Sequence, residues 1–456
     1  MQPLWSSADL TAALGIPVPL GIASTGVVID SRRVRPGDIY VAIKGERQDG
    51  YAYVDSAFKA GAVAALVNKP HDNPAAILVP DTHKALEDLG AYARRRFTGK
   101  VVGITGSIGK TTSKEMLARV LSVFGATYAT TGNLNNHYGV PLTLANMPPG
   151  AMYAVIEMGM NHAGEIRSLT LQAQPDVAAI TAIAPVHLEN FANLAGIAAA
   201  KAEIAEGLTP GGVFIYSIDH AEGAVLAAAG KGLRVKTTST QQAADYFASD
   251  IQYTPHAATF SLNGALYSVS ESSLALVAAA TLAVATVEAL GLEPQRAVEA
   301  IASYASVDGR GAVQTIPWGL DDGVITVIDQ SYNSSPVAVA ASLETFGRMP
   351  VRGRRIAVLG DMKELGGSAA QLHAGLADAV VAAGVDSVVT VGALMRHLYA
   401  ALPSTLRVAA VDTAAEALTA VAASIKSGDA VLVKGSHSVG LESVVAGLAR
   451  GRRNAV

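Results

Sequence analysis

A glycine-rich loop between a short apolar strand and a helix is the strongest local pattern in this chain of 456 residues. The predicted strand is Val101–Thr105, the loop continues through Gly106–Gly109, and a helix is predicted to begin near Lys110. Glycines let backbone amides approach phosphate oxygens, the helix N-terminus adds the positive end of its dipole, and a lysine adds a point charge. The pattern predicts a cradle for a nucleotide triphosphate, with the hydroxyl of Thr111 on a magnesium ion.

The spacing of the glycines differs by one residue from the general P-loop pattern. Gly103 and Gly109 are separated by five residues instead of four, and Ile104 stands where the first glycine would fall. A glycine-rich turn that only opens a helix is the alternative interpretation. The combination of a strand, a Lys-Thr pair and a helix favours the phosphate-binding interpretation.

The composition indicates a folded protein. Half of the residues are apolar and 16% are charged, which excludes an intrinsically disordered chain. The most apolar window, Leu274–Val287, is shorter than the roughly 20 apolar residues that a bilayer requires, so it predicts a buried helix and no membrane span. The absence of cysteine excludes disulfides, thiolate nucleophiles and cysteine zinc sites.

The net charge and the N-terminal residues indicate where the protein is expected to act and which partners it is not expected to bind. The net charge of −4 provides no electrostatic footprint for nucleic acid. No basic segment precedes an apolar stretch near Met1, which predicts a protein that is not exported. We therefore expect a cytoplasmic monomer that binds neither nucleic acid nor a membrane.

The distribution of apolar runs predicts an α/β protein of three domains: a small N-terminal α/β domain at 1–98, a central P-loop domain with a parallel sheet at 99–310, and a C-terminal Rossmann-like domain at 311–456. From about residue 101 onward, short apolar runs alternate with helical patterns, the order that builds parallel sheets. The loop 307–311 is predicted as a hinge. The C-terminal domain lacks a Gly-x-Gly-x-x-Gly fingerprint at its first turn, which disfavours a dinucleotide. The other predicted elements are a helix at Val54–Ala60 and strands at Val27–Ile29, Ile39–Ala42, Ala64–Val67, Ala154–Met158, Val177–Ala184, Val324–Ile328, Ile356–Leu359, Val388–Val391 and Ala430–Val433.

Two polar side chains follow central strands. Glu157 ends the run 154–157, and His187 follows the run 177–184. Ligands of open parallel sheets bind outside the carboxyl ends of the strands, so both side chains are expected on the same edge as the loop. A local cap or a surface position is the alternative for each residue alone. Magnesium ligation is the economical interpretation beside a triphosphate.

Four further features have both a structural and a functional interpretation. Lys201 is alone on a small, apolar helical face, where a side chain that extends to water is the ordinary expectation. Polar clusters at 132–136, 329–333 and 434–438 follow apolar runs, and turn chemistry explains each one by itself. Their distribution over two domains favours a site built between domains.

At these residues the chain resembles the Mur ligases, the ATP-dependent amide-forming enzymes of bacterial cell-wall precursor synthesis. The spacing of five residues in the loop is also that of the family. The run Asn135–Pro141 and the segment Gly360-Asp361-Met362 favour the branch that joins D-alanyl-D-alanine to UDP-N-acetylmuramoyl-tripeptide. The motifs that carry the resemblance are Leu4-Trp5-Ser6, Asp30-Ser31-Arg32, Pro36-Gly37-Asp38, Thr105–Thr112, Gly132–Pro141, Glu157-Met158-Gly159, His187-Leu188-Glu189, Lys201-Ala202-Glu203, Asp329, Tyr332-Asn333, Pro336, Gly360–Gly366 and Lys434-Gly435-Ser436.

The resemblance implies that 1–98 holds the UDP-sugar, that 99–310 binds ATP and Mg²⁺, and that 311–456 closes and binds the incoming dipeptide. Lys201 matches the lysine that carbon dioxide carbamylates in this family, which turns a cation into a metal-binding carboxylate. Arg310 matches an arginine that reaches the phosphates on closure. The implied catalytic residues are Lys110, Lys201, His187, Arg310 and Asp329. The implied ATP contacts are Thr105, Gly106, Ser107, Gly109, Lys110, Thr111, Thr112 and Asn333. The implied metal ligands are Thr111, Glu157, His187 and Lys201. The implied substrate contacts are Ser31, Arg32, Asn135 and Asn136.

The chain departs from the family pattern at two places. Ser272, Ser273 and Leu276 stand where many members carry a His-Asn or His-Ser pair and a later Asn, so the adenine contacts are not assigned. Gln330 replaces a usual second acid. Two alternatives remain open: a related Mur or folylpolyglutamate-type amide ligase, and a switch protein that hydrolyses a nucleotide without forming a bond.

Overall fold

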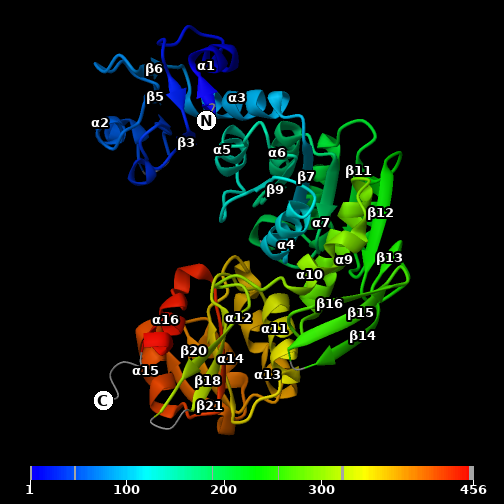
Figure 1. Cartoon of the computed structure of the whole chain (residues 1–456). Helices are drawn as coiled ribbons and strands as arrows, with labels where there is room; N and C mark the ends of the chain where they lie inside the picture. Colours follow the sequence, from blue (N-terminus) through cyan, green and yellow to red (C-terminus); the bar gives the residue numbers. More distant parts are fainter. Residues whose placement is uncertain (1–2, 46–47, 187, 255, 320–322, 451–456) are drawn as a thin grey trace.

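The computed structural model describes residues 3–45, 48–186, 188–254, 256–319 and 323–450. Three α/β units follow one another along the chain, and each contains its own parallel or mainly parallel sheet. Figure 1 shows the N-terminal and C-terminal units at the two ends of the central unit. The expected α/β fold class is confirmed.

The N-terminal unit contains a four-stranded parallel sheet with its strands in sequence order. Its longest helix, α3 (Thr82–Arg96), begins at Asp81, whose carboxylate accepts hydrogen bonds from the amides of His83 and Lys84. The other elements are β1 (Trp5–Ser6), α1 (Ser7–Leu14), β2 (Ala23–Ser24), β3 (Gly26–Val28), η1 (Ser31–Arg33), β4 (Asp38–Val41), η2 (Gly50–Tyr53), α2 (Val54–Lys59), β5 (Ala64–Val67) and β6 (Ala76–Leu78).

Polar contacts attach the N-terminal unit to α5 (Gly139–Ala145) of the central unit. The indole nitrogen of buried Trp5 donates to the carbonyl of Ala145 at 2.9 Å. The side-chain amide of Asn146 both accepts from and donates to the backbone of Val27, at 2.9 and 2.8 Å. Directional bonds of this kind fix the register between two units more strictly than apolar contact does.

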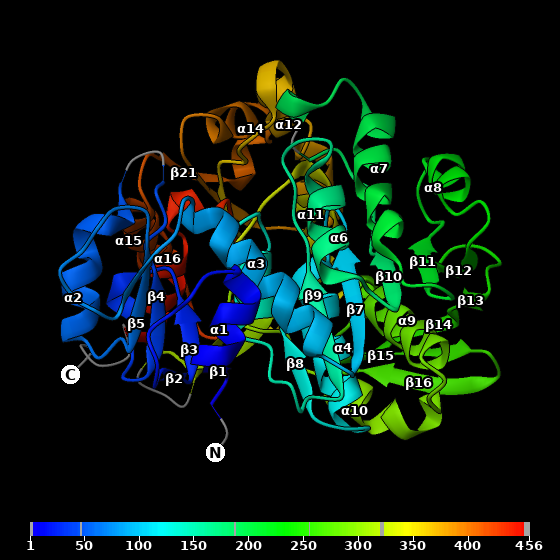
Figure 2. The ribbon, with the colours of Figure 1, turned by 90° about the horizontal axis from the view of Figure 1, so that it is seen from above.

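The central unit is a doubly wound sheet of seven parallel strands in the order β13-β12-β11-β10-β7-β9-β8. Side chains of alternate strand residues enter two separate cores. One core lies under α4, α9 and α10, and the other lies under α5, α6, α7 and α8 (Figure 2). The bounds are β7 (Lys100–Thr105), α4 (Lys110–Ser122), β8 (Thr127–Ala129), β9 (Tyr153–Glu157), α6 (Glu165–Ala173), β10 (Val177–Ile180), η3 (Leu188–Asn190), α7 (Leu194–Ala202), η4 (Glu203–Gly207), β11 (Val213–Ser217), α8 (Gly223–Ala229), β12 (Arg234–Ser239), β13 (Tyr246–Phe247), α9 (Leu274–Ala289), η5 (Pro294–Ala297) and α10 (Val298–Ala302).

The alanine-rich window is a buried helix, as predicted. Most of α9 (Leu274–Ala289) is buried on all sides by the sheet, α4 and the strands that precede it. In the part of the chain that the structure describes, no helix has both the length and the apolar character needed to cross a bilayer.

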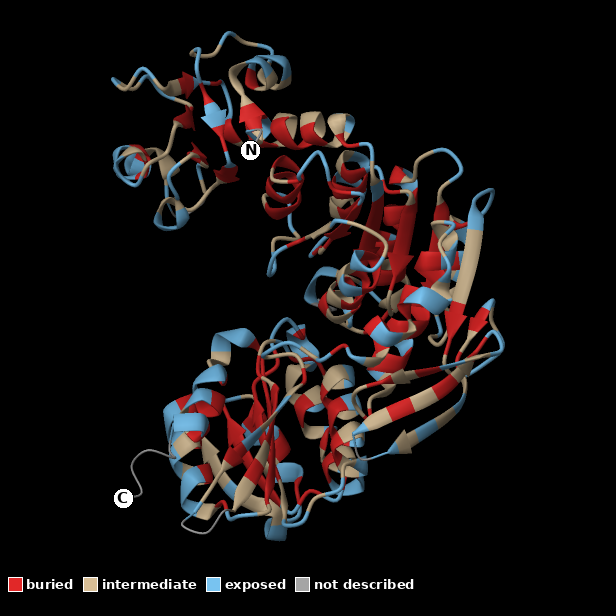
Figure 3. Ribbon diagram, viewed as in Figure 1, coloured by how far each residue is buried: buried red, intermediate tan, exposed pale blue. Residues whose placement is uncertain are grey.

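An antiparallel sheet lies between β13 and α9, and the sequence analysis missed it. Strands β14 (Ser249–Thr254), β15 (Ala257–Leu262) and β16 (Ala265–Val269) pair in sequence order. Only every second residue of β15 is buried, because one face packs on α9 and the other faces outward (Figure 3). The expectation of uninterrupted strand–helix alternation after residue 101 is wrong here, because this alternating pattern is typical of a half-exposed antiparallel sheet.

The C-terminal unit has a six-stranded sheet in the order β17-β18-β22-β19-β20-β21, parallel except for β17. Strand β22 is inserted between β18 and β19, and the helices that follow β18 and β22 pack on opposite faces of the sheet. Helices cover both faces of the sheet. The bounds are β17 (Ala312–Pro317), β18 (Val324–Gln330), α11 (Pro336–Arg348), β19 (Arg355–Gly360), η6 (Gly366–Ser368), α12 (Ala369–Ala374), α13 (Ala377–Ala382), β20 (Ser387–Val391), α14 (Met395–Ala401), η7 (Ser404–Leu406), β21 (Arg407–Val411), α15 (Ala414–Ser424), β22 (Ala430–Lys434), η8 (His437–Val439) and α16 (Glu442–Arg450).

The central and C-terminal units meet at the carboxyl edges of their sheets. Gly366 of η6 lies against Glu189 of η3. A Cβ atom added to Gly366 would lie 3.6 Å from the Cβ of Glu189. Figure 2 shows α12 next to the segment that leads into α7. The two edges that carry the predicted polar clusters therefore belong to one region.

Candidate active site

The glycine-rich loop has the geometry of an anion cradle. Gly109 has φ = 79° and directly precedes α4, so the free amides of the first helical turn face the loop. Gly106 also has a positive φ, and a Cβ at that position would collide with the hydroxyl of Thr181. The ammonium of Lys110 donates to the carbonyls of Gly106 at 2.6 Å and Ser107 at 3.3 Å. Burial lowers the pKa of Lys110, and Glu157 opposes this shift.

The segment after β10 supports the loop from behind. The hydroxyl of Thr181 donates to the carbonyl of Ile108 at 2.6 Å. Ser107 donates twice, from its amide to Ala182 and from its hydroxyl to Ala184, at 2.8 and 3.0 Å. Thr105 is fully buried at the end of β7, and Thr112 is partly buried in the first turn of α4. Hydrogen bonds to the segment after β10 therefore hold the loop in place.

Glu157 is the carboxylate at the centre of this edge. It ends β9, is 1% exposed, and accepts hydrogen bonds from the hydroxyl of Thr111 at 3.0 Å and the side-chain amide of Asn135 at 2.8 Å. The backbone amide of Glu157 donates to the hydroxyl of Thr130. A buried carboxylate requires donors of this kind. The structure thus brings together three residues that the sequence assigned separately: Thr111, Asn135 and Glu157.

The oxygen donors at this point fit a magnesium ion. Mg²⁺ prefers oxygen ligands, and it is commonly held by one or two carboxylates with phosphate oxygens and water. Glu157 and Thr111 offer a carboxylate and a hydroxyl beside the loop. Within the described ranges, no three His, Cys, Asp or Glu side chains form a shared metal cluster. His187, predicted as a catalytic and metal-binding residue, lies outside the described residues.

The side chain of Lys201 is buried near Lys110, at the same edge of the central sheet. It is 1% exposed near the end of α7, and burial together with the charge of Lys110 holds the pKa of Lys201 well below its ordinary value. The interpretation of Lys201 as a side chain that extends to water is wrong. No described residue forms a hydrogen bond or an ion pair with its Nζ atom, so no described side chain offsets the cost of burying a charge there.

Arg310 lies in the predicted hinge between α10 and β17. Its guanidinium packs over the ring of Tyr332, 4.2 Å from the ring centroid, and the same ring stacks on His437 at 5.1 Å. Asp329 fixes this loop, because its carboxylate accepts from the amide of Gly309 at 2.9 Å and from Ser331. The backbone carbonyl of Asp329 also accepts from the amide of Gly311 at 2.7 Å, so Asp329 holds the backbone on both sides of Arg310.

Arg310 also connects the two sheet edges electrostatically. Its charge lowers the pKa of Lys110 at the central edge and of Lys434 at the C-terminal edge. Asn333 is exposed after β18, and its carbonyl accepts a hydrogen bond from the ammonium of Lys434 at 3.0 Å. The predicted ATP contact Asn333 therefore lies at the C-terminal edge, opposite the loop.

The remaining predicted contacts are distributed more widely. Ser31 and Arg32 form η1 of the N-terminal unit, where Arg32 is paired with Asp30. The side chain of Asn136 accepts from the amides of Tyr138 and Gly139, so it caps the entry to α5. No contact to the loop is present for these three residues. Ser272 is buried with an unpaired hydroxyl, Ser273 caps α9, and Leu276 is buried in the core.

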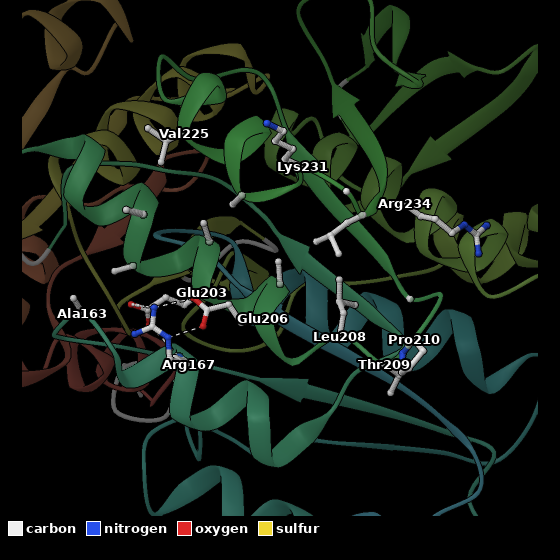
Figure 4. Close-up of a pocket in the computed structure, with 18 of the residues that line it drawn as sticks. Ala163, Arg167, Glu203, Glu206, Leu208, Thr209, Pro210, Val225, Lys231 and Arg234 are labelled. Atoms are coloured by element: carbon white, nitrogen blue, oxygen red, sulfur yellow. Dashed lines mark hydrogen bonds and ion pairs between the residues drawn. The ribbon is translucent and has the colours of Figure 1, made fainter.

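A separate cavity of about 1000 Å³ lies on the other side of α7. Figure 4 shows its walls, formed by α6, α7, η4, α8 and β12, with Arg167 paired to Glu206 at one end. Ala200 and Ala202, the neighbours of Lys201, line it, and Lys201 does not. None of the predicted site residues lines this cavity, so it is distinct from the candidate active site.

Sequence reasoning missed two residues that shape the site, Thr181 and Thr130, and it named Lys434 only within the polar cluster 434–438. Thr181 supports the loop, Thr130 holds the backbone of Glu157, and Lys434 bonds to Asn333. Thr181 follows β10, Thr130 follows β8 and Lys434 ends β22, so the rule that ligands bind at the carboxyl ends of parallel strands points to all three positions.

Comparison with known proteins gives matches along the whole chain. Three family models match: Mur ligase family, catalytic domain, at residues 24–94; Mur ligase middle domain at 104–282; and Mur ligase, glutamate ligase domain, at 318–437. Among curated proteins, the UDP-N-acetylmuramoyl-tripeptide–D-alanyl-D-alanine ligase of Escherichia coli strain K12 is 35% identical over 94% of both chains. The ligase of the same name from Bacillus subtilis strain 168 is 32% identical over 92% of both chains.

Solved structures agree with these matches. The crystal structure of MurF from Acinetobacter baumannii has a TM-score of 0.87, is 31% identical and covers 98% of both chains. MurF ligase from Thermotoga maritima in complex with ADP has a TM-score of 0.81 and is 27% identical, over 95% of this chain and 99% of that one.

Proposed function

The chain belongs to the Mur ligase family, and from this premise we propose that it joins D-alanyl-D-alanine to UDP-N-acetylmuramoyl-tripeptide and converts ATP to ADP and phosphate. The observation that carries the proposal is the similarity of nearly the whole chain to ligases of that name, together with a preformed phosphate cradle beside Glu157. The product belongs to peptidoglycan precursor synthesis.

The proposed reaction has two steps. The terminal carboxylate of the tripeptide attacks the γ-phosphorus of ATP, the bond to ADP breaks, and an acyl phosphate forms. The dipeptide amine then attacks the acyl carbon, phosphate leaves, and an amide remains. Phosphoryl transfer depends mainly on positioning and on charge stabilisation. The loop amides, Lys110 and Arg310 supply these, and Mg²⁺, when bound at Thr111 and Glu157, neutralises charge on the phosphates.

Lys201 fits the carbamylation that the family resemblance implies. Carbon dioxide reacts with a neutral amine, and burial together with the charge of Lys110 shifts the pKa of Lys201 in the direction that favours this form. A carbamate at this position would replace an uncompensated buried amine with a carboxylate-like ligand. The His187 side chain completes the proposed metal set.

The three units divide the proposed work. We assign the UDP-sugar to 1–98 through Ser31 and Arg32, ATP to 99–310, and the dipeptide to 311–456, with Asn333 on the ATP. Closure of the last unit would exclude water from the acyl phosphate, which water otherwise destroys. The cytoplasmic location and the monomeric state stay predictions from the sequence.

The proposal is tested by ADP release from the purified protein with Mg²⁺, ATP and the UDP-linked tripeptide, with and without D-alanyl-D-alanine. We expect release that requires the dipeptide, and a product with the mass of the pentapeptide. Turnover with single amino acids in place of the dipeptide would indicate a sister ligase. Release that is independent of both substrates would indicate a nucleotide-hydrolysing switch.

A further inference from the structure

Lys434 is a buried lysine at a point of the C-terminal sheet where the helices that follow two neighbouring strands, β18 and β22, pack on opposite faces. It ends β22, the strand inserted between β18 and β19, and it pairs in register with Gln330 and Leu359. Ligands of open α/β sheets bind in the crevice at such a point, outside the carboxyl ends of the strands. This edge faces the central unit, where the acyl phosphate of the proposed reaction would form.

The surroundings of Lys434 disfavour an ammonium ion. A protonated lysine has three N–H donors, and among the described residues the ammonium of Lys434 forms one hydrogen bond, to the carbonyl of Asn333 at 3.0 Å. The side chain is 5% exposed, so water reaches it poorly. Lys110, in contrast, has two carbonyl acceptors and the nearby charge of Glu157.

The charged groups around Lys434 do not stabilise its ammonium form. The acidic side chains at the carboxyl ends of the flanking strands are Asp329 in β18 and Asp361 directly after β19. Both carboxylates are engaged elsewhere: Asp329 with Gly309 and Ser331, and Asp361 with the amide of Met395 and the ammonium of Lys363. His437 is stacked on Tyr332. Among the described residues, no carboxylate forms an ion pair with Lys434, whereas the charge of Arg310 opposes its protonation. Burial and Arg310 lower the pKa of Lys434 to about 8.

We propose that Lys434 is the proton acceptor for the incoming amine. In this step the dipeptide arrives as an ammonium ion and transfers one proton to the neutral amine of Lys434. Its freed electron pair then forms the bond to the acyl carbon, the carbon–oxygen bond to phosphate breaks, and the second proton of the nitrogen leaves with the phosphate. The ordinary pKa of an α-amino group is about 7.7–8.0, so the transfer to Lys434 is nearly balanced in energy. The inference rests on the proposed function.

The test compares two nucleophiles in the holoenzyme with Mg²⁺, ATP and the UDP-linked tripeptide. D-alanyl-D-alanine requires loss of a proton, whereas hydroxylamine is neutral at about pH 7 and traps an acyl phosphate as a hydroxamate without a base. We expect Lys434→Met to lower turnover with the dipeptide by about 10²- to 10⁴-fold, the usual contribution of a general base. Hydroxamate formation should stay within a few-fold. The loss with the dipeptide should shrink as the pH rises above 8, where the dipeptide amine is neutral in solution.

Two further variants separate the proton role from a charge role. Lys434→Arg keeps a cation but cannot act as a base, and we expect it to lose dipeptide turnover as Lys434→Met does. Lys426→Met, an exposed lysine of the same unit, is the matched control and should behave like the unaltered protein. If Lys434→Met fails to fold, as judged by its thermal unfolding, the arginine variant and the two nucleophiles give the same comparison.

Three outcomes would overturn the inference. If Lys434→Arg retains dipeptide turnover, Lys434 acts as a cation, for example on a phosphate. An equal loss of hydroxamate and dipeptide product in Lys434→Met would show that Lys434 serves acyl phosphate formation. The absence of hydroxamate from the unaltered protein would overturn the proposed function itself, which is a distinguishable failure.

Discussion

His373 holds the loop after β19 through a hydrogen bond that requires a neutral imidazole. It is fully buried in α12, its Nε2 accepts from the amide of Met362 at 3.0 Å, and its Nδ1 donates to the carbonyl of Ala369 at 2.6 Å. The same loop places Gly366 against Glu189 of the central unit. We predict that His373→Leu frees the amide of Met362 without emptying the core.

The size of the effect follows from the bond that is lost. A buried donor without an acceptor costs about 1–3 kcal/mol, which corresponds to a change of about 5- to 150-fold in an equilibrium constant. Hydrogen exchange reads such local opening directly. We expect the amides of 361–363 to exchange faster by about that factor in His373→Leu. In His373→Gln, whose side-chain oxygen can accept the same bond, we expect most of the protection to remain.

The pH dependence of folding stability provides a second test of the role of His373. Burial lowers the pKa of His373 from its ordinary value of 6.5, with Lys363 and His397 acting in the same direction and Asp361 against it. The folded state therefore binds the proton less readily than the unfolded state, so stability is fully present above about pH 6.5 and is lost as the pH falls toward the lowered value. The slope is at most about 1.4 kcal/mol per pH unit. His373→Gln should remove this contribution.

Unchanged exchange at 361–363 in His373→Leu would refute the reasoning, because the amide of Met362 would then not depend on the imidazole. Equal acceleration in His373→Leu and His373→Gln would also refute it, since the acceptor would not matter. Exchange in α4 serves as the internal control and should stay the same in both variants.

Three other perturbations address the central edge. Gly106→Ala places a Cβ against the hydroxyl of Thr181, and we expect it to abolish ATP binding in a fluorescent-nucleotide assay; retained affinity would contradict the fit of the loop. Asn135→Leu removes a donor to the buried carboxylate of Glu157, which costs about 1.5–3 kcal/mol, and we expect weaker Mg²⁺-dependent ATP binding by titration calorimetry, whereas unchanged binding would show that Asn135 is dispensable. Lys201→Met should remove a carbamate signal in the NMR spectrum of protein exposed to isotope-labelled carbon dioxide, and a signal that persists would exclude Lys201 as its source.

Apolar periodicity and turn residues were enough to predict buried strands and helices from the sequence. The predicted strand Ala64–Val67 has the same bounds in β5, and the apolar window from Leu274 became α9. The strand at 177–184 is shorter than predicted, because β10 ends at Ile180 and Thr181 turns to bond the glycine-rich loop. The apolar pattern of the sequence does not predict β14–β16, because about half of their residues face outward and interrupt the apolar runs that mark a buried strand.

Single residues of the site could be predicted from the sequence, but the contacts between them could not. The cradle, Glu157 and Lys201 follow from strand ends and from an isolated lysine, because these are local patterns. That Asn135 donates to Glu157, that Arg310 packs on Tyr332, and that Lys434 bonds to Asn333 depends on segments far apart in the chain. No periodicity encodes such contacts, so only the folded arrangement of the strands reveals them.

The fate of the carboxylate oxygen of the tripeptide tests the central claim most directly. The tripeptide is prepared with its terminal carboxylate labelled with heavy oxygen, and the phosphate released during turnover with ATP, Mg²⁺ and D-alanyl-D-alanine is analysed by mass spectrometry. An acyl phosphate transfers one carboxylate oxygen to phosphate, so the account predicts one heavy oxygen in each phosphate from a fully labelled carboxylate. Unlabelled phosphate released together with the amide product would contradict it, because the carboxylate would then not have been phosphorylated.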